Sequence, residues 1–455
     1  MPIIRDIDFE TGAALTPGSY RIRKITITNK IGEVADIQSL ITEFSITESL
    51  FSPALVCKVS VKDAANFIET FPVYGQETLR ISVQRIQGPK GALQEIDLLF
   101  YVTEYPLFGR PKQQHLQAFT ITGVRPHAYA SSLERISRSW NGPVADQITK
   151  ISGDFFGISP LVRGGPIAEG RGIINIQPPL LAIDWFRRRL FNGIFAPFYF
   201  YERLSGDIYL DSHDFLVNEP EHGIYYDGRD FNEVVATQED YEQRKRRMLD
   251  VTSALKLSKY LQAEKGTFAS ENNFLDIATK QFSKRYFDYE GRFPKQGTLE
   301  KTSVLEPPKA MDYGPLDILG SPSADINPEE LNSKYFSYME FLSTNSSAYE
   351  GDIQNYSTSL SSTAIDTLNS FIGLFNTYNH DVRLFGDMEL NAGSKVILKF
   401  PKAVDPQQEL EANGSLADKY DDSLSGKFLV VSAIHTFSSG KYYTDIRCKR
   451  DSFTK

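Results

Sequence analysis

The sequence predicts a mostly β protein of the α+β class. Through the first 125 residues, apolar and polar side chains alternate with a period of two, which is typical of half-buried antiparallel strands. The same alternation returns between Gly386 and Phe453, with polar turns between the apolar runs. After Pro126 the apolar residues take up helical spacing, so helices and strands are predicted in separate parts of the chain.

The first 125 residues predict a barrel or a sandwich. Leu55, Cys57 and Val59 point to one side of a strand, while Lys58 and Ser60 point to the other. Short strands at this density are typical of small all-β domains. The predicted strands are Tyr20–Thr28, Gln38–Thr47, Leu55–Val61, Leu79–Val83, Ile96–Glu104 and Gln117–Thr122, with a short helix at Asp63–Phe71.

Residues 126–218 predict a mixed α/β domain. Val144, Ile148 and Ile151 fall at helical spacing behind Pro143, which suits a first helical turn. A second helix is expected behind a pair of prolines, and a hairpin after it. The predicted elements are helices at Val144–Phe155 and Leu180–Phe191, a hairpin at Phe198–Leu210 and a flexible loop at Gly164–Gly172.

Residues 219–378 predict an irregular, loop-rich α+β insert. Val251–Lys259 suits a strand, and Asn272–Tyr286 suits either a helix or an extended segment. Turn-forming residues are dense at 293–330 and again at 343–363, which predicts loops. A helix follows. Its apolar face is expected to pack in the core of the same chain, and the alternative is a helix–helix contact with another subunit. Its apolar face comprises Ile365, Leu368, Ile372, Leu374, Phe375 and Tyr378.

Residues 379–455 predict a small antiparallel barrel. Gly386–Pro401 suits a strand, a polar turn and a second strand. Tyr442, Thr444 and Ile446 alternate with charged neighbours, whereas Phe428–Ile434 is apolar on both faces. A strand that is covered on both sides suits a barrel wall packed against another domain or subunit.

Composition and charge exclude several classes of protein. The 455 residues carry a net charge of -9, which disfavours a general attraction to nucleic acid phosphates. We expect no signal peptide, because the N-terminus lacks a basic region before an apolar stretch, and no membrane span, because no long apolar run exists. Cys57 and Cys448 lie in strand-like runs, so we expect buried thiols and a reducing compartment.

The six histidines are scattered along the chain. The tightest cluster of carboxylates and imidazoles follows the predicted hairpin, and such groups bind divalent cations. A solvated strand end is favoured there over a metal site, because one strand face holds only part of the cluster. Its members are Asp211, His213, Asp214, Glu219, Glu221 and His222. His435 lies inside an apolar strand, where a hydrogen-bonded structural histidine is favoured over a general base.

Other motifs with chemical meaning are weak. Gly164–Gly172 lacks the Gly-Lys-Ser/Thr ending of a phosphate-binding loop, and Asp421–Asp422 is a carboxylate pair of the kind any acidic protein has. The basic runs Arg187–Arg189 and Arg244–Arg247 favour a solvated face or acidic partners over phosphate contacts. No catalytic, cofactor-binding or metal-binding residue is therefore predicted, and no cofactor is expected.

Motifs at both ends and in the middle resemble the baseplate hub protein of contractile-tail, T-even-like bacteriophages. Related hub domains occur in the spike proteins of type VI secretion systems. Residues 290–360 and the 401–425 loop do not match the family. The matching motifs are Ile41–Phe51, Cys57–Asp63, Gly75–Val83, Trp185–Leu190, Phe198–Phe215, Leu390–Phe400, Gly426–Phe437 and Lys441–Thr444.

The resemblance implies a fold with two similar tube-type antiparallel β-barrels and mixed α/β regions between them. The expected units are a first barrel at 1–125, the α/β domain at 126–218, the insert at 219–378 and a second barrel at 379–455. In this family three subunits form a pseudo-sixfold ring that joins a sixfold tail tube to a threefold spike. Because the last strand ends near Lys455, the spike and any hydrolase are expected to be separate chains.

The resemblance also implies a structural protein of the virion and not an enzyme. The expected partners are two further copies of the chain, the central spike protein, tail tube or tube-initiator proteins, the tape measure protein and baseplate wedge proteins. DNA is expected to pass through the channel without specific binding, and no membrane insertion is expected. Two alternatives stay open, namely a tail-associated cell-wall hydrolase that uses Asp and Glu, and the hub of a bacterial contractile injection system.

Overall fold

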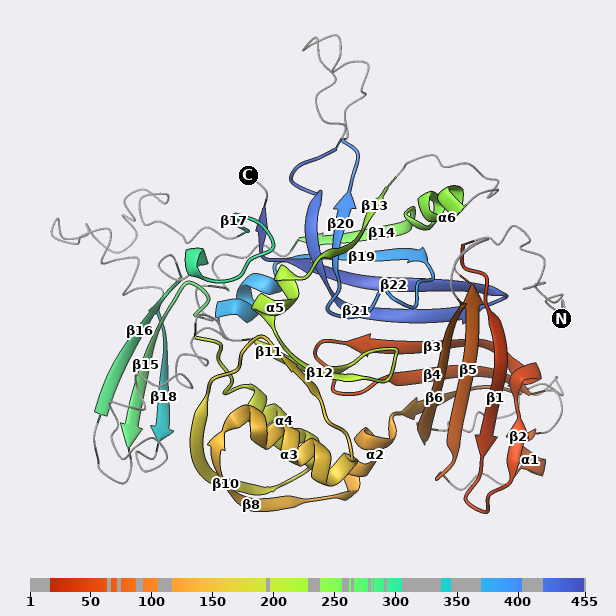
Figure 1. The fold of residues 1–455 in the computed structure, drawn as a ribbon, viewed down its shortest axis with the longest axis horizontal. Helices are drawn as coiled ribbons and strands as arrows, with labels where there is room; N and C mark the ends of the chain where they lie inside the picture. The colour runs from red at the N-terminus through yellow and green to blue at the C-terminus, as the bar shows by residue number, and fades with distance from the viewer. Residues whose placement is uncertain are drawn as a thin grey trace, which may run out of the picture.

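The computed structural model describes most of the chain, in several separate ranges. These are residues 17–63, 67–71, 75–86, 93–104, 117–193, 197–227, 238–255, 262, 266–276, 280, 282–289, 293–304, 337–344, 370–402 and 420–453. The protein is mostly β, as the sequence predicts, and its helices cluster in the middle of the chain. Figure 1 shows the strands at the two ends of the chain lying against one another, far apart though they are in sequence.

The N-terminal elements form a curved antiparallel sheet over a shared core. They are β1 (Arg21–Thr28), β2 (Val34–Asp36), the 3-10 helix η1 (Gln38–Leu40), β3 (Ile41–Ser49), β4 (Val56–Asp63), α1 (Phe67–Thr70), β5 (Thr78–Ile86), β6 (Leu93–Glu104) and β7 (Gln117–Val124). The strands pair in the order β3-β4-β7-β6-β5-β1-β2. Figure 1 shows β1, β5 and β6 turned across the direction of β3 and β4, so the sheet wraps around Ile46, Val59 and Ile81.

The C-terminal strands close on one another. They are β19 (Tyr378–Phe385), β20 (Lys395–Lys399), β21 (Gly426–Ser438), β22 (Lys441–Arg450) and the short β23 (Ser452–Phe453). Two strands from the preceding region, β13 (Glu221–Tyr226) and β14 (Met248–Leu255), extend this sheet, so the pairing runs β14-β19-β22-β21-β20-β13. A bridge between Tyr226 and Arg247 then links β13 back to the start of β14. The core inside includes Val382, Leu398 and Val430.

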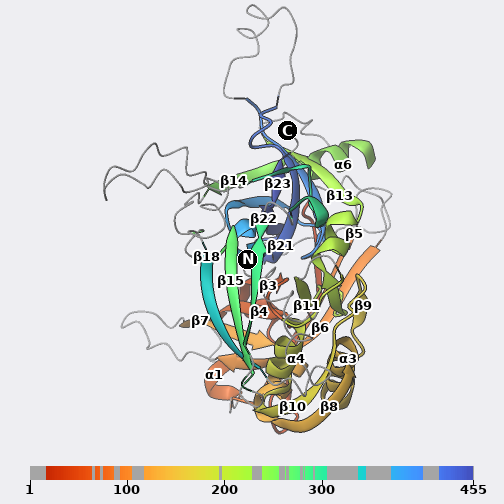
Figure 2. The same ribbon diagram turned by 90° about the vertical axis from the view of Figure 1, so that its left-hand side faces the viewer.

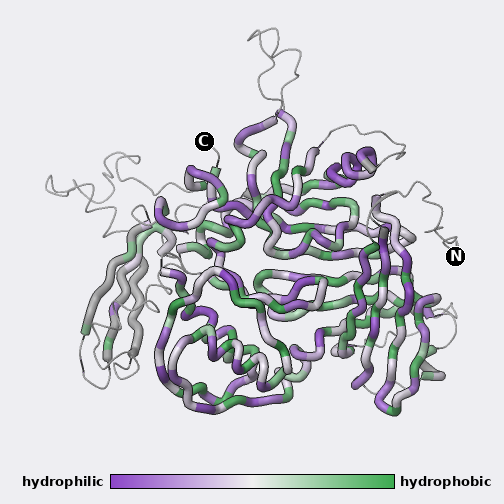
Figure 3. The backbone as a smooth tube through the Cα atoms, viewed as in Figure 1, coloured by the Kyte–Doolittle hydropathy of each residue, from purple (hydrophilic) through white to green (hydrophobic). Residues whose placement is uncertain are grey.

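One continuous sheet joins the two ends of the chain. β21 pairs antiparallel with β3, from Ser432 opposite Ser49 to Ser438 opposite Glu43. The resulting sheet has 13 strands, and nearly all of its pairs are antiparallel. Phe437 of β21 stacks on Phe44 of β3 at 4.5 Å between ring centroids, which places C-terminal side chains in the N-terminal core. The period-two patterns at both ends of the chain therefore belong to one structure, which Figure 3 shows as alternating colours along the strands.

Helices and short strands alternate between the two ends of the chain, from α2 to α5. The elements of this region, the α/β unit, are α2 (Pro126–Leu133), β8 (Ile136–Pro143), α3 (Val144–Phe156), β9 (Leu161–Arg163), β10 (Glu169–Gln177), α4 (Pro179–Arg187), β11 (Phe198–Glu202), β12 (Ile208–Ser212) and α5 (His213–Asn218). α3 follows Pro143 and ends at Gly157, whose φ of 66° suits a glycine. The flexible loop predicted at Gly164–Gly172 is wrong in part, because Glu169 onward pairs with β8.

The insert contains more regular structure than its composition predicts. α6 (Gln238–Lys245), β15 (Ala269–Asp276), β16 (Phe282–Asp288), the 3-10 helix η2 (Phe293–Lys295), β17 (Thr302–Ser303) and β18 (Ser337–Thr344) complete the element order. β16, β15 and β18 form a three-stranded sheet along one side of the molecule, which Figure 2 shows from that side. The extended reading of Asn272–Tyr286 is thus correct. The helix predicted to reach Tyr378 ends earlier, because residues 370–375 are helical and Tyr378 begins β19.

The two cysteines are buried free thiols, as predicted. Cys57 and Cys448 each have 0% of their surface exposed, and burial raises the pKa of Cys57 to about 12. Since the thiolate is the reactive form, we expect neither thiol to react with Ellman's reagent at pH 8 in the native protein. Both should react within the mixing time once the chain is unfolded in guanidinium. Rapid release of one equivalent from the native protein would contradict this burial.

Among the described residues, no helix combines the length and the apolar character needed to cross a membrane.

Candidate functional site

The outward face of the continuous sheet is polar across both ends of the chain. On β3, for example, Phe44 and Ile46 point into the core, whereas Ser45 and Thr47 are half-buried on the opposite face. Across β21, β3, β4 and β7 the outward positions line up in register and carry mainly hydroxyl groups. These hydroxyl residues are Ser45, Thr47, Ser49, Ser60, Thr120, Thr122, Ser432, Thr436 and Ser438.

Charged side chains border this hydroxyl-rich face in pairs of opposite sign. On β19 and β22, Arg383 donates two hydrogen bonds to Asp445, at 2.6 Å from Nε and 3.0 Å from Nη2. Arg447 does the same to Asp381, at 2.7 and 3.1 Å. Exposed pairs of this kind add little stability, but they neutralise the surface locally. The face therefore combines hydroxyl groups and arginine–aspartate pairs with the exposed Lys58 and Lys62 of β4.

A buried carboxylate holds the two ends of the sheet and the α/β unit together. Glu48 of β3 is 1% exposed and accepts hydrogen bonds from three directions. Its Oε2 accepts from the backbone N–H of Leu204 at 3.0 Å, and its Oε1 accepts from the N–H of Ala392 at 2.9 Å. His435 Nε2 lies 3.2 Å from the same Oε1. The other ring nitrogen of His435 lies 2.7 Å from the Tyr442 hydroxyl.

A second buried ionic cluster lies at the same junction. The carboxylate of Asp387 lies 2.7 Å from Lys245 Nζ and 3.0 Å from His222 Nε2. Burial by itself raises the pKa of Asp387, but the hydrogen bond from His222 and the charge of Lys245 outweigh it and hold the pKa far below its usual range. Fully buried Arg85 of β5 donates to the carbonyl of Gly386 and to the Tyr241 hydroxyl.

The possible metal ligands between Asp211 and His222 do not come together in the structure. Asp211 accepts two hydrogen bonds from Arg163, at 2.7 and 2.6 Å, and His213 lies 3.3 Å from Asp451. Asp214 accepts from the N–H of Gly297 at 2.9 Å. The solvated strand end is wrong as well, because Asp211 is 0% exposed and His213 begins a helix.

The remaining members of that cluster also have separate partners. His222 pairs with Asp387, and Glu221 lies 2.9 Å from Lys427 Nζ of β21. Glu219 is the C-cap of α5. Within the part of the chain that the structure describes, no group of three or more His, Cys, Asp or Glu residues is placed to hold a metal ion. Asp211, Asp214 and Glu221 each bond to a residue that is distant in sequence, which sequence spacing does not reveal.

The other sequence-predicted motifs have structural partners. His435 is a buried, hydrogen-bonded histidine, as predicted. Arg187 and Arg188 pair with Asp184, and Asp421 accepts from the N–H groups of Ser423 and Leu424 at a turn. In the second basic run, Lys245 supplies one of the charges around Asp387.

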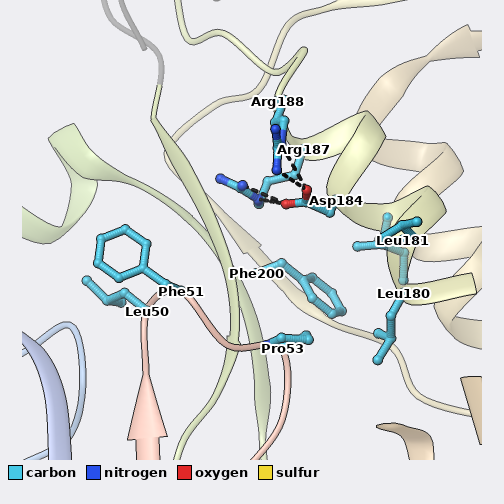
Figure 4. A pocket seen from close by; sticks show the side chains of 10 residues that line it. Leu50, Phe51, Pro53, Leu180, Leu181, Asp184, Arg187, Arg188 and Phe200 are labelled. Atoms are coloured by element: carbon cyan, nitrogen blue, oxygen red, sulfur yellow. Dashed lines mark hydrogen bonds and ion pairs between the residues drawn. The ribbon is translucent and has the colours of Figure 1, made fainter. Parts of the chain in front are cut away.

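A cleft opens between the α/β unit and the end of β3. Its cavity volume is about 430 Å³. Figure 4 shows Phe200 between two walls, with Leu50, Phe51 and Pro53 on one side and Leu180 and Leu181 of α4 on the other. Asp184, Arg187 and Arg188 lie at one end of the cleft.

The arginines at the end of the cleft share a single carboxylate. Asp184 accepts from Arg187 Nη2 at 2.6 Å and from Arg188 Nε at 2.8 Å. Burial alone raises the pKa of Asp184, but the two arginines outweigh it and leave the pKa below its usual range. Two guanidinium groups against one carboxylate leave one positive charge beside an apolar cleft.

Comparisons with solved structures identify similar proteins. The 43 kDa tail protein of prophage MuSo2 from Shewanella oneidensis aligns with a TM-score of 0.51 at 11% sequence identity, over 94% of this chain and 98% of that one. A tail protein from Neisseria meningitidis MC58 aligns with a TM-score of 0.49 at 10% identity, over 96% and 98% of the two chains. A type VI secretion component of E. coli aligns with a TM-score of 0.41 at 7% identity, over 95% and 77%.

The alignment with the Shewanella protein establishes a shared fold. The Shewanella protein shares the fold over nearly the whole length of both chains, so the resemblance to phage tail proteins that the sequence indicates is confirmed at the level of the fold. No protein-family model matches the chain, and no curated protein sequence does.

Proposed function

We propose that this chain is a structural protein of a contractile phage tail, namely the baseplate hub. The single observation that supports this most is the 13-stranded sheet, which joins a barrel-type unit at each end of the chain edge to edge. Three copies of a chain with two such units give six units around a ring. Such a ring matches a sixfold tail tube on one side and a threefold spike on the other.

We propose the same four units as the sequence predicts, except that two strands of the insert belong to the second barrel-type unit. One barrel-type unit comprises residues 1–125 and the other residues 379–455, and 126–218 forms the α/β unit. The insert at 219–378 contributes β13 and β14 to the second barrel-type unit, because these strands pair with β20 and β19.

The hydroxyl-rich face of the sheet is proposed to line the channel of this ring. It is a polar face that runs from β21 through β3 to β4 and β7. The arginines of β19 and β22 beside it are paired with aspartates, whereas Lys58 and Lys62 of β4 are exposed on it. Binding of DNA to proteins gains its affinity from cationic contacts to phosphates. Apart from Lys58 and Lys62, this face offers hydroxyls and neutralised arginines, so we expect DNA to pass without specific binding.

We propose that the protein is located in the baseplate of the virion and is assembled there in the host cytoplasm. The partners are the central spike, tube or tube-initiator proteins, the tape measure protein and baseplate wedge proteins. A structural and non-catalytic role is supported by the buried carboxylates of the α/β unit, since Glu202 and Asp211 are each bonded to an arginine. Both side chains are buried.

The proposal is tested by the mass of the purified protein in solution. We expect light scattering to give a mass near three times 51.3 kDa, either for the protein alone or after its spike partner is added. A species that stays at 51.3 kDa in the presence of spike and tube proteins would rule out the hub. Lysis of cell walls by the purified chain would favour the hydrolase instead.

A further inference from the structure

The edge strand β14 is bonded to the core beneath the C-terminal strands through a histidine of β19. β14 stands at one end of the strand order and pairs antiparallel with β19, where Ser253 lies opposite His380. The hydroxyl of Ser253 lies 2.6 Å from His380 Nδ1. Ser253 and its neighbours Thr252 and Ala254 are exposed, whereas His380 is fully buried. A change at His380 therefore reaches an exposed strand through one hydrogen bond.

His380 lies among aromatic rings. Its ring centroid is 4.8 Å from that of Phe400, 4.9 Å from that of Phe428 and 5.2 Å from that of Tyr378. Its second nitrogen, Nε2, is buried and has no hydrogen-bond partner among the described residues. Moving an ion from water into surroundings of this kind costs free energy unless a bonded counter-charge compensates it. The burial of both ring nitrogens therefore favours the neutral imidazole.

A permanent positive charge lies in the same aromatic cluster. Arg450 of β22 is fully buried, and its guanidinium carbon lies 4.2 Å from the centroid of the Tyr378 ring. It donates hydrogen bonds to two backbone carbonyls, and the carboxylates of Glu300 and Asp421 partly balance its charge. Because arginine stays protonated throughout the physiological range, a charged His380 would place two buried cations in one cluster.

The other ionisable groups around His380 do not remove this repulsion. Burial and then the charge of Arg450 lower the pKa of His380 from 6.5 to about 4, against the smaller effects of the Leu424 carbonyl and Asp381. Two uncharged groups also face the imidazole, and burial raises the pKa of each. They are the thiol of Cys448, which lies opposite His380, and the phenol of Tyr378.

The charge of His380 is therefore coupled to the contact between β14 and β19. When the contact is open, the imidazole is in water and has its ordinary pKa of about 6.5. Protons bind to this open form more readily than to the closed form, whose pKa is about 4. The closed form is thus fully favoured above about pH 6.5 and loses this advantage as the pH falls toward 4. Between pH 7 and pH 5 the opening equilibrium constant rises about twentyfold.

We propose that His380 is a pH-sensitive contact, which holds β14 on β19 at neutral pH and releases it in acid. Protonation places a second buried cation beside Arg450, and the repulsion is relieved when β14 separates and water reaches the imidazole. This conformational change goes beyond the proposed hub role. It does not depend on a ring, because all of its residues lie within one chain.

Hydrogen–deuterium exchange of the full-length protein tests this proposal. Exchange is measured at pH 7 and pH 5, with labelling times scaled to the intrinsic exchange rate at each pH. We expect the opening constants of residues 248–255 and 378–385 to rise about twentyfold at pH 5, and those of β5 and β6 to change by less than about threefold. An equal rise in β5 and β6 would indicate global unfolding and would refute the proposal.

Two variants separate the charge of His380 from its hydrogen bond. His380→Gln removes the titrating group, so the rise at pH 5 should fall below about threefold. Ser253→Ala removes the hydrogen bond but keeps the imidazole, so opening should increase at both pH values while the twentyfold ratio is kept. A full rise in His380→Gln, or loss of the rise in Ser253→Ala, would contradict the assignment.

A second buried histidine provides the matched control. His127 of α2 is 4% exposed, and burial lowers its pKa to about 4 as well. Because α2 belongs to a different part of the structure, His127→Gln should leave the opening of residues 248–255 unchanged at both pH values. An equal effect of His127→Gln and His380→Gln on these residues would assign their acid sensitivity to the whole fold and refute the proposal.

A measurement on the wild type does not depend on any variant. Exchange of the histidine C2 proton, followed by mass spectrometry, gives the pKa of each histidine in the native protein. We expect the pKa of His380 to lie well below 6.5, and a pKa of 6.5 or above would refute the proposal. None of these outcomes bears on the mass measured by light scattering, so this proposal and the hub proposal fail separately.

Discussion

Replacing Glu48 with alanine is expected to lower the free energy of unfolding by about 3–5 kcal/mol. The substitution leaves the N–H groups of Leu204 and Ala392 buried with no acceptor, and it removes the partner of His435 Nε2. Because these groups belong to three different parts of the chain, the loss weakens the junction itself. Urea denaturation followed by circular dichroism gives the difference in free energy.

Two further variants test whether the loss of stability comes from the buried carboxylate of Glu48. Glu43→Ala removes a carboxylate from the opposite, outward face of the same strand, and we expect a change within about 0.5 kcal/mol. Glu48→Gln keeps one carbonyl acceptor and should fall between the two. Equal effects of Glu43→Ala and Glu48→Ala would show that the junction does not depend on this carboxylate.

Asp387→Asn is expected to destabilise the protein by a similar amount, about 3–5 kcal/mol at pH 7. Because asparagine has nearly the same shape as aspartate, the change in stability reports the loss of the negative charge. Without the carboxylate, Lys245 is left buried without its anion, and the charge of nearby Arg85, which also lowers the pKa of Asp387, is less compensated. Thermal and urea unfolding of the two proteins at pH 7 measures the difference.

The stabilisation by Asp387 should also depend on pH in a defined direction. Its pKa in the folded protein is far below 3.8, the ordinary value of an aspartate. A carboxyl whose pKa is lowered by folding contributes its full stability above its unfolded pKa and loses it as the pH falls through the folded pKa. The difference between the wild type and Asp387→Asn should therefore be constant above about pH 5 and shrink below about pH 4.

A neighbouring exposed carboxylate provides the control for this pH dependence. Glu389 lies two residues further on and is exposed, so Glu389→Gln should change stability little at any pH. A difference between wild type and Asp387→Asn that grows as the pH falls from 5 to 3 would contradict the assigned charge state of Asp387.

Local patterns in the sequence predicted most strands and their faces correctly. The alternation of Leu55, Cys57 and Val59 with Lys58 and Ser60 reappears as the inward and outward faces of β4. The same held for Tyr442–Cys448 on β22. The predictions from composition were less successful than those from periodicity. Glycine content predicted a loop where β10 begins, and turn-forming residues predicted loops where the insert forms strands.

The partners of each strand were decided by the tertiary structure alone. Backbone hydrogen bonds hold β21 against β3 and β13 against β20, and the alternation within one strand does not say which distant strand will supply its partner groups. The same holds for the buried charges. Glu48 meets His435 across 387 positions of sequence, and Arg85 meets Gly386 across 301.

By itself the sequence determined that this protein is mostly β, that its two cysteines are buried and that His435 is structural. It also indicated the phage tail fold, through motifs spread over the whole chain. Only the tertiary structure decided that the two ends share one sheet, that the carboxylates around His213 have separate partners, and that a cleft lies beside α4. Periodicity is a local property that a chain carries in its sequence, whereas burial and ion pairing depend on which distant residues the fold brings together.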